Sequence, residues 1–200
     1  MRKKKRKNHI LIIDTSDRSA DLYYGCRFSA PDPFVLLICS RTRHLIVSYL
    51  EYGRAQGHAH KQTKAYKLTV WTPEMLGIRS RKGNYLSKWS CALLRKLNIR
   101  QVVVPMVFPH AIAKHLIQRG IRVIPSKGPL FPSREVKTDQ ELTNIKQSQL
   151  AATKAMISAI DLIRKCPVGP VGYLMRKKNQ RLQSEHVQRV IQGVLLDNRA

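Results

Sequence analysis

Four histidines stand close enough in pairs to raise the question of metal binding. His58 and His60 lie in a polar segment that we expect to be a loop, without a carboxylate beside them. His110 and His115 are five residues apart, so on a helix they would not share a face. A metal site needs several such ligands at one point. Both pairs are therefore predicted to be ordinary histidines and not metal ligands.

Carboxylates are scarce in the second part of the chain. Glu185 and His186 are neighbours, and neighbouring residues on a helix point to different faces. Two-metal hydrolysis needs several converging carboxylates, and the sequence has no phosphate-binding loop or nucleophile motif. We therefore predict no catalytic residue and no metal ligand in this chain. The acids after Val136 are Asp139, Glu141, Asp161, Glu185 and Asp197.

Asp14 follows the apolar run Ile10–Ile13, which resembles the first strand of ribonuclease-H-like nucleases. In those enzymes such an aspartate begins a carboxylate cluster that holds two metals. Here the strands expected at 101–105 and 121–124 lie in a stretch without acids. We therefore expect Asp14 to cap the helix that follows it, and we expect no nuclease activity.

Positive charge dominates the composition. The chain has 37 Lys and Arg against 12 Asp and Glu, a formal net charge of +25. Residues 2–7 carry six of these charges, and no acid occurs between Glu74 and Glu135. We expect a positive face over the middle of the fold that attracts polyanions. Because aromatic residues make up only 6% and form no recognition strand, nucleic-acid binding is expected to be nonspecific.

The four cysteines show neither a C-x-x-C pair nor a regular spacing. This pattern predicts reduced, mostly buried thiols and not a disulfide framework or a zinc site. The apolar run after the basic N-terminus covers only Ile10–Ile13, which is short for a signal peptide. No apolar run approaches the ~18 residues of a membrane helix. We expect a cytoplasmic protein without a membrane partner.

Strands and helices alternate along the first part of the chain. Short apolar runs predict the strands, and capped or amphipathic stretches predict the helices. This order is typical of an α/β domain with a mixed, partly parallel sheet and flanking helices. The expected strands are 10–13, 34–39, 44–47, 67–70, 101–105 and 121–124, the expected helices are 16–24, 50–55, 85–97 and 110–118, and 77–83 is expected to be a basic loop.

A long helix is predicted within the stretch Arg134–Arg164, after a cap at Thr138. Thr138 and Glu141 match a capping box near its start, and Pro167 ends it. Apolar residues at three-four spacing are expected to form its buried face. These residues are Leu142, Ile145, Ala152, Met156, Ala159 and Ile163.

A second amphipathic helix is expected after the turn at 167–172, with Ser184 as its cap. Its apolar side comprises Val187, Val190, Ile191, Val194 and Leu195. The two helices have no sheet to cover. Their apolar faces must therefore pair with each other, fold back on the first domain or meet another chain.

Several motifs resemble one peptidase family. Residues 134–142, Arg-Glu-Val-Lys-Thr-Asp-Gln-Glu-Leu, precede the long helix. Upstream stand Ser19–Tyr24, Pro31–Phe34 and Leu50–Ala55. Together they resemble the N-terminal domain and linker of Xaa-Pro peptidases, the family of aminopeptidase P, prolidase and creatinase. The resemblance covers nearly the whole chain from about Ile10.

This resemblance implies three parts. Residues 1–8 are a basic tail, and 9–132 form a creatinase-type N-terminal α/β domain of ribonuclease-H-like topology. Residues 133–200 are a linker and the first two helices of a pita-bread peptidase domain, truncated before its metal ligands. Complete members bind two divalent metal ions, Mn, Co or Zn, and hydrolyse the bond before proline. This chain alone is expected to hold no cofactor and to be inactive.

The resemblance also suggests contact residues and partners. Tyr24, Asp32 and Arg54 are candidates for contact with substrate or with another subunit, and a homo-oligomer is expected. An interdomain hinge is expected at Arg134, Lys137, Thr138 and Glu141. A peptide substrate is expected only when the catalytic domain is supplied. The alternative is a non-catalytic basic module that binds nucleic acid or protein.

Overall fold

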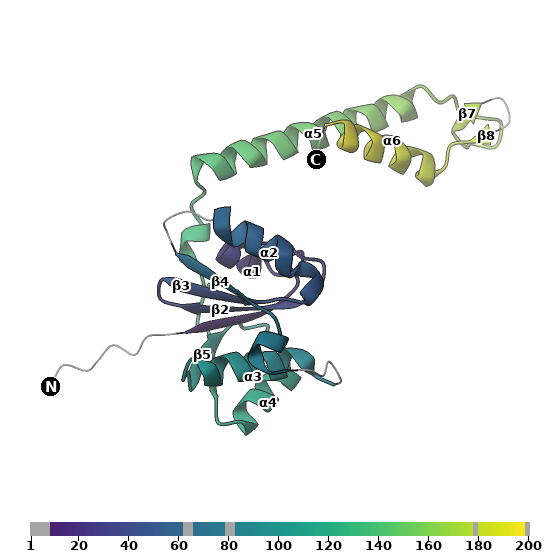
Figure 1. Ribbon diagram of the computed structural model, residues 1–200. Helices are drawn as coiled ribbons and strands as arrows, with labels where there is room; N and C mark the ends of the chain where they lie inside the picture. Colours follow the sequence, from purple (N-terminus) through teal and green to yellow (C-terminus); the bar gives the residue numbers. More distant parts are fainter. Residues whose placement is uncertain (1–8, 62–65, 79–82, 178–179, 199–200) are drawn as a thin grey trace. The chain divides into compact units, whose positions relative to one another are not determined.

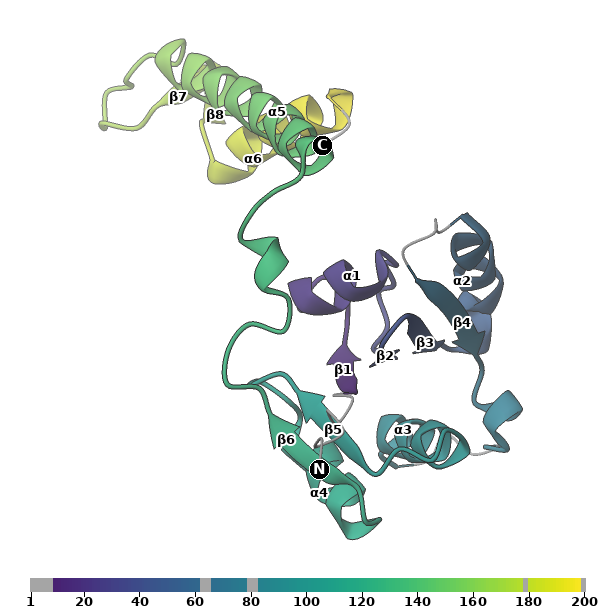
Figure 2. The same ribbon diagram turned by 90° about the vertical axis from the view of Figure 1, so that its left-hand side faces the viewer.

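The computed structural model describes residues 9–61, 66–78, 83–177 and 180–198. The chain divides into two compact units, Met1–Arg134 and Glu135–Ala200, hereafter unit 1 and unit 2 (Figures 1 and 2). The basic tail predicted at 1–8 and the centre of the loop expected at 77–83 lie outside the described residues.

Unit 1 is built on a six-stranded sheet of order β4-β3-β2-β1-β5-β6. β2 pairs antiparallel with β1 and β3, whereas the pairs β3–β4, β1–β5 and β5–β6 are parallel. The mixed, partly parallel sheet predicted from the sequence is confirmed. Its strands are β1 (Ile10–Asp14), β2 (Phe34–Cys39), β3 (Thr42–Ile46), β4 (Lys67–Trp71), β5 (Gln101–Val104) and β6 (Arg122–Pro125).

Helices cover both faces of this sheet. α1 (Ala20–Cys26) and α2 (Tyr49–Lys61) lie on one face, and α3 (Tyr85–Lys96) and α4 (His110–Gln118) lie on the other (Figures 1 and 2). Side chains alternate across a strand, so Leu36 joins the core under α1 and α2 while Leu37 joins the core under α3 and α4. This double burial explains why β2 is a continuous apolar run.

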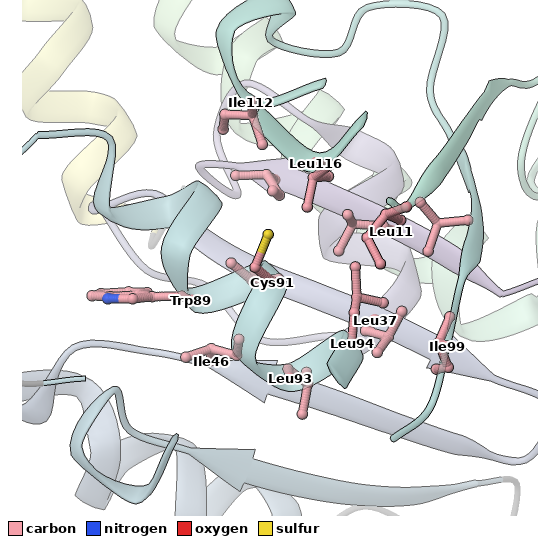
Figure 3. Close-up of a cluster of buried hydrophobic side chains, with 14 of the residues drawn as sticks. Leu11, Leu37, Ile46, Trp89, Cys91, Leu93, Leu94, Ile99, Ile112 and Leu116 are labelled. Carbon is pink, nitrogen blue, oxygen red and sulfur yellow. The ribbon is translucent and has the colours of Figure 1, made fainter. Parts of the chain in front are cut away.

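Figure 3 shows the core between the sheet and the helices α3 and α4. Leu11 and Leu37 come from adjacent strands, and Trp89 and Leu94 come from the apolar side of α3. Leu116 of α4 completes the layer. Burial of each such side chain contributes about 1.5–3 kcal/mol, so this layer is a main source of stability for unit 1.

The helices on this face follow the sequence prediction closely. α4 has the predicted bounds, and Gly120 follows it with φ of 80°. Asn84 caps α3, because its side-chain oxygen accepts the Ser87 N–H at 3.4 Å. The predicted helix at 85–97 is one residue longer than the observed one.

The start of α1 corrects two predictions. The helix begins at Ala20 and not at Ser16, and the hydroxyl of Ser19 accepts the Leu22 N–H at 3.1 Å. Ser19 is therefore the cap, and the prediction that Asp14 caps this helix is wrong. The hydroxyl of Ser16 is used elsewhere, since it donates to the buried Ala30 carbonyl at 3.0 Å.

The polar loop expected around His58 and His60 is also wrong, because both lie in α2. The helix continues to Lys61 because Ala55 is buried in the core and Ala59, four residues later on the same side, packs against that core. The Nε2 atom of His58 lies 2.9 Å from the Cys26 carbonyl oxygen, and its ring contacts Phe28. His58 therefore joins α2 to the end of α1.

In unit 2, α5 (Asp139–Arg164) packs along α6 (Ser184–Asp197). The predicted capping box is confirmed: the Thr138 hydroxyl accepts the Glu141 N–H, and Glu141 accepts the Thr138 N–H. The predicted buried face is wrong except at Ala159. The buried residues of α5 are Ala151, Ala155 and Ala159, and the large apolar side chains predicted for this face are exposed. Small residues let two helices approach closely, which explains this choice of face.

α6 has the predicted half-buried side, including Val187, Val190 and Leu195. Its cap is Gln183 and not Ser184, because His186 Nδ1 accepts the Gln183 N–H at 3.2 Å. A small hairpin of β7 (Met175–Lys177) and β8 (Gln180–Arg181), which the sequence analysis did not predict, precedes the helix.

Candidate functional site

The parallel strands β1, β5 and β6 end at one edge of the sheet. Residues at and after their carboxyl ends line a cleft of about 520 Å³. The chain leaves β1 in one direction through β2, β3 and β4, and it later adds β5 and β6 on the other side. Ligands commonly bind at such a switch in strand order, outside the carboxyl ends of the strands. The cleft is therefore the best candidate site in unit 1.

Two carboxylate–arginine pairs line the cleft. Asp14 stands at the end of β1, and Arg18 lies 3.8 Å from its carboxylate. Asp21, in the first turn of α1, pairs with Arg134 at the end of unit 1. The Asp14 carboxylate also accepts the Thr15 N–H at 2.8 Å. Each acid thus has a cationic partner.

This geometry suits the binding of a charged ligand, because each pair places a carboxylate beside a guanidinium in the wall of the cleft. Met106 and Val107 stand at the rim with 73% and 91% of their surface exposed. The cleft therefore offers both charges and an apolar rim to a ligand with charged ends.

The Asp21–Arg134 pair is expected to couple the two residues by about 1 kcal/mol in a double-mutant cycle of Asp21→Asn and Arg134→Gln. Both side chains are partly shielded from solvent. The Asp14–Arg18 pair, whose arginine side chain is 80% exposed, should give no more than about 0.3 kcal/mol. Urea unfolding followed by fluorescence measures both cycles, because Trp71 and Trp89 are the two tryptophans and lie in unit 1. Equal coupling in the two cycles would contradict the assignment.

The predicted contact residue Tyr24 lies at the end of α1 and faces the segment that closes unit 1. Its hydroxyl is 3.1 Å from the Ser133 hydroxyl, and its ring centroid is 5.4 Å from that of Phe131. The Arg27 guanidinium covers the same ring at 4.5 Å. In this structure Tyr24 is therefore a packing residue between α1 and residues 131–133.

Arg54 and Asp32, the other two predicted contact residues, lie at or in the loop 27–33. Arg54 of α2 donates to the Ser29 carbonyl at 2.7 Å, pairs with Glu51 and covers the Phe28 ring. Asp32 is exposed in the loop itself. Tyr24 reaches the same loop through Arg27. The three residues therefore surround one loop, but none of them lines the cleft.

The residues predicted as an interdomain hinge fall on both sides of the boundary between the units. Arg134 is the last residue of unit 1 and lines the cleft. In unit 2, the Lys137 ammonium donates to the Glu135 carbonyl at 3.1 Å, and Thr138 and Glu141 form the capping box. Each has a local structural role, and their use as a hinge stays a prediction.

Metal-binding geometry is absent from the part of the chain that the structure describes. Within residues 9–61, 66–78, 83–177 and 180–198 there is no group of three or more His, Cys, Asp or Glu that could hold an ion. The four cysteines are free thiols; Cys26, Cys91 and Cys166 are buried, and burial raises the pKa of Cys26 to about 11. No described helix is long and apolar enough to cross a membrane.

Solved structures identify the fold. An Xaa-Pro dipeptidase from Bacillus anthracis matches 96% of this chain with a TM-score of 0.63 and 16% identity. A prolidase from Pyrococcus horikoshii OT3 matches 98% with a TM-score of 0.66 and 16% identity. An X-Pro aminopeptidase from Thermotoga maritima matches 96% with a TM-score of 0.65 and 13% identity. The fold is that of the N-terminal domain of prolidases.

This prolidase-type fold confirms the fold class predicted from the sequence motifs. The chain spans 44–47% of the length of these three solved proteins. No protein-family model matches the sequence, and a search of curated proteins gave no significant match.

The residues of the cleft were mostly missed by the sequence analysis. Arg18 was not singled out, and Asp21 was named only within the motif Ser19–Tyr24. Asp14 was considered only as a nuclease ligand or a cap, and Arg134 only as part of the junction motif and of the hinge. The available signal was the carboxyl end of each predicted parallel strand, where Asp14 and residues 105–107 and 126–130 follow.

Proposed function

We propose that this chain is the N-terminal portion of a Xaa-Pro peptidase, an enzyme that hydrolyses the bond before proline. The observation that carries the proposal is the match of 96–98% of the chain, across both units, to the structures of an Xaa-Pro dipeptidase, a prolidase and an X-Pro aminopeptidase. The junction motif at residues 134–142 supports it independently. A peptide is then the substrate of the complete enzyme.

Two divalent metal ions, Mn, Co or Zn, would serve such an enzyme. The described residues of this chain do not fit that role, because no group of three or more ligands converges in them. We therefore assign the metals to a catalytic domain outside this structure and expect the 200 residues alone to be inactive. The role left for unit 1 is to shape the substrate cleft and to contact another subunit of a cytoplasmic homo-oligomer.

The loop 27–33 is the proposed contact element within unit 1. Arg54 fixes it through Ser29, and Arg27 stacks on Tyr24. Asp32 projects from it at the surface. A loop held at Arg27 and Ser29, with the exposed acid Asp32 beyond them, can meet a substrate amine or a basic group of another subunit.

The test combines the coding sequence beyond codon 200 with a peptidase assay. We expect the reading frame to continue, or to resume after one frameshift, with paired Asp, one His and two Glu on strand-like segments. The longer product should release proline from Ala-Pro in the presence of Mn²⁺, Co²⁺ or Zn²⁺, and residues 1–200 should not. Gly-Ala is the matched control substrate and should stay intact.

A stop codon directly after Ala200, with a stable product that leaves Ala-Pro intact, would overturn the proposal. The alternative, a non-catalytic basic binding module, would then be the better account of the chain.

A further inference from the structure

Two helix-to-strand connections in unit 1 have the same design. The first joins α3 to β5 through residues 94–100, Leu-Arg-Lys-Leu-Asn-Ile-Arg. The second joins α4 to β6 through residues 116–122, Leu-Ile-Gln-Arg-Gly-Ile-Arg. Each has a buried leucine, a buried isoleucine five residues later and then an arginine.

The backbone explains why this pattern exposes the arginine. Asn98 and Gly120 have φ of 53° and 80°, the left-handed conformation that ends a helix. The Ile99 N–H then donates to the Leu94 carbonyl at 2.8 Å, and the Ile121 N–H donates to the Leu116 carbonyl at 3.0 Å. Each isoleucine is thereby held in the core, and the residue after it emerges at the surface where the strand begins.

The parallel pairing of β5 with β6 brings the two connections together. The Arg122 N–H donates to the Arg100 carbonyl at 2.8 Å. Between the connections lies a groove of about 470 Å³ lined by Arg95, Asn98, Arg100 and Arg119. We call the exposed set Arg95, Arg100, Arg119 and Arg122 the twin-loop patch.

The patch keeps its positive charge. None of its four arginines is in an ion pair with a carboxylate of the described residues. The four arginines together carry a charge of +4. The C-terminal ends of the α3 and α4 helix dipoles contribute about −0.5 each, so a net charge of about +3 remains. The acids Asp14 and Asp21 line the cleft at the opposite, carboxyl edge of the parallel strands.

We infer that the twin-loop patch binds the phosphodiester backbone of nucleic acid without reading its sequence. The planar guanidinium fork matches phosphate oxygens, and phosphates along a strand supply the closely spaced charges that four arginines need. None of the residues that line the groove is aromatic, so the groove offers no ring on which a base could stack. This inference does not depend on the peptidase proposal.

Fluorescence anisotropy with a labelled 20-base-pair duplex of random sequence tests the site, using the full chain between 50 and 200 mM NaCl. The patch variant carries Arg95→Gln, Arg100→Gln, Arg119→Gln and Arg122→Gln. The control variant carries Lys146→Gln, Lys165→Gln, Arg176→Gln and Arg189→Gln, which removes the same charge from exposed positions of unit 2.

Each phosphate contact contributes about −0.9 to the slope of the logarithm of the binding constant against the logarithm of the salt concentration. The magnitude of this negative slope should therefore be smaller by about 3–4 in the patch variant than in the wild type. The control variant should lower it by less than about 1. An Arg→Lys version of the patch keeps the charge and should keep the slope. Its retention would show that binding follows the positive charge at these four positions.

Three results would overturn the inference. Equal losses in the two Gln variants would mean that only net charge matters. Wild-type binding by the patch variant would place the binding elsewhere, with the basic residues 2–7 as the first alternative. ATP is compared with unlabelled duplex as a competitor at equal phosphate concentration. If ATP displaces the labelled duplex equally well, the patch is a site for small nucleotides instead.

Discussion

The double variant Leu36→Ala/Leu37→Ala is expected to be unfolded at 25 °C. Both side chains are fully buried in β2, but they fill different cores on opposite faces of the sheet. Each substitution alone should cost about 2–5 kcal/mol. Because the sheet separates the two sites, the losses should add to about 4–10 kcal/mol, which is comparable to the whole stability of a domain.

Urea unfolding followed by tryptophan fluorescence measures the three variants, since both tryptophans belong to unit 1. Leu50→Ala is the matched control, because Leu50 is 84% exposed on α2 and its loss should change stability by less than about 0.5 kcal/mol. A single variant as stable as wild type would show that one face of the sheet is not packed as described.

The framework of unit 1 could be predicted because local sequence determines it. The apolar run Phe34–Cys39 between turn residues gives β2 its bounds, and the capping Asn84 and the terminating Gly120 mark helix ends. Each of these signals acts over a few residues. The prolidase-type fold followed from motifs that combine such signals.

The failures occurred where distant residues choose between local alternatives. Asp14, Ser16 and Ser19 were all possible caps for α1, and the choice of Ser19 leaves the Ser16 hydroxyl to bind Ala30. The cleft could not be predicted for a similar reason. Its lining comes from residues 12–21, 105–107 and 126–134, which only the order of the strands brings together.

The largest effect expected in unit 2 tests one such choice, the buried face of α5. The sequence pattern places Ala152 on that face, whereas the structure buries Ala155, which is 2% exposed, and leaves Ala152 exposed. Ala155→Glu should destabilise the pairing of α5 with α6 by about 3–5 kcal/mol, because it puts a bulky charge into a close helix contact.

Ala152→Glu is the matched control, with the same change of residue, charge and helix propensity only three positions away. It should alter stability by less than about 0.5 kcal/mol. Amide hydrogen exchange reports on unit 2 directly, so protection of residues 184–197 should fall by about 100-fold or more in Ala155→Glu and stay unchanged in Ala152→Glu. The reverse result would restore the face predicted from apolar spacing. It would also mean that bulky side chains, and not alanines, hold the two helices together.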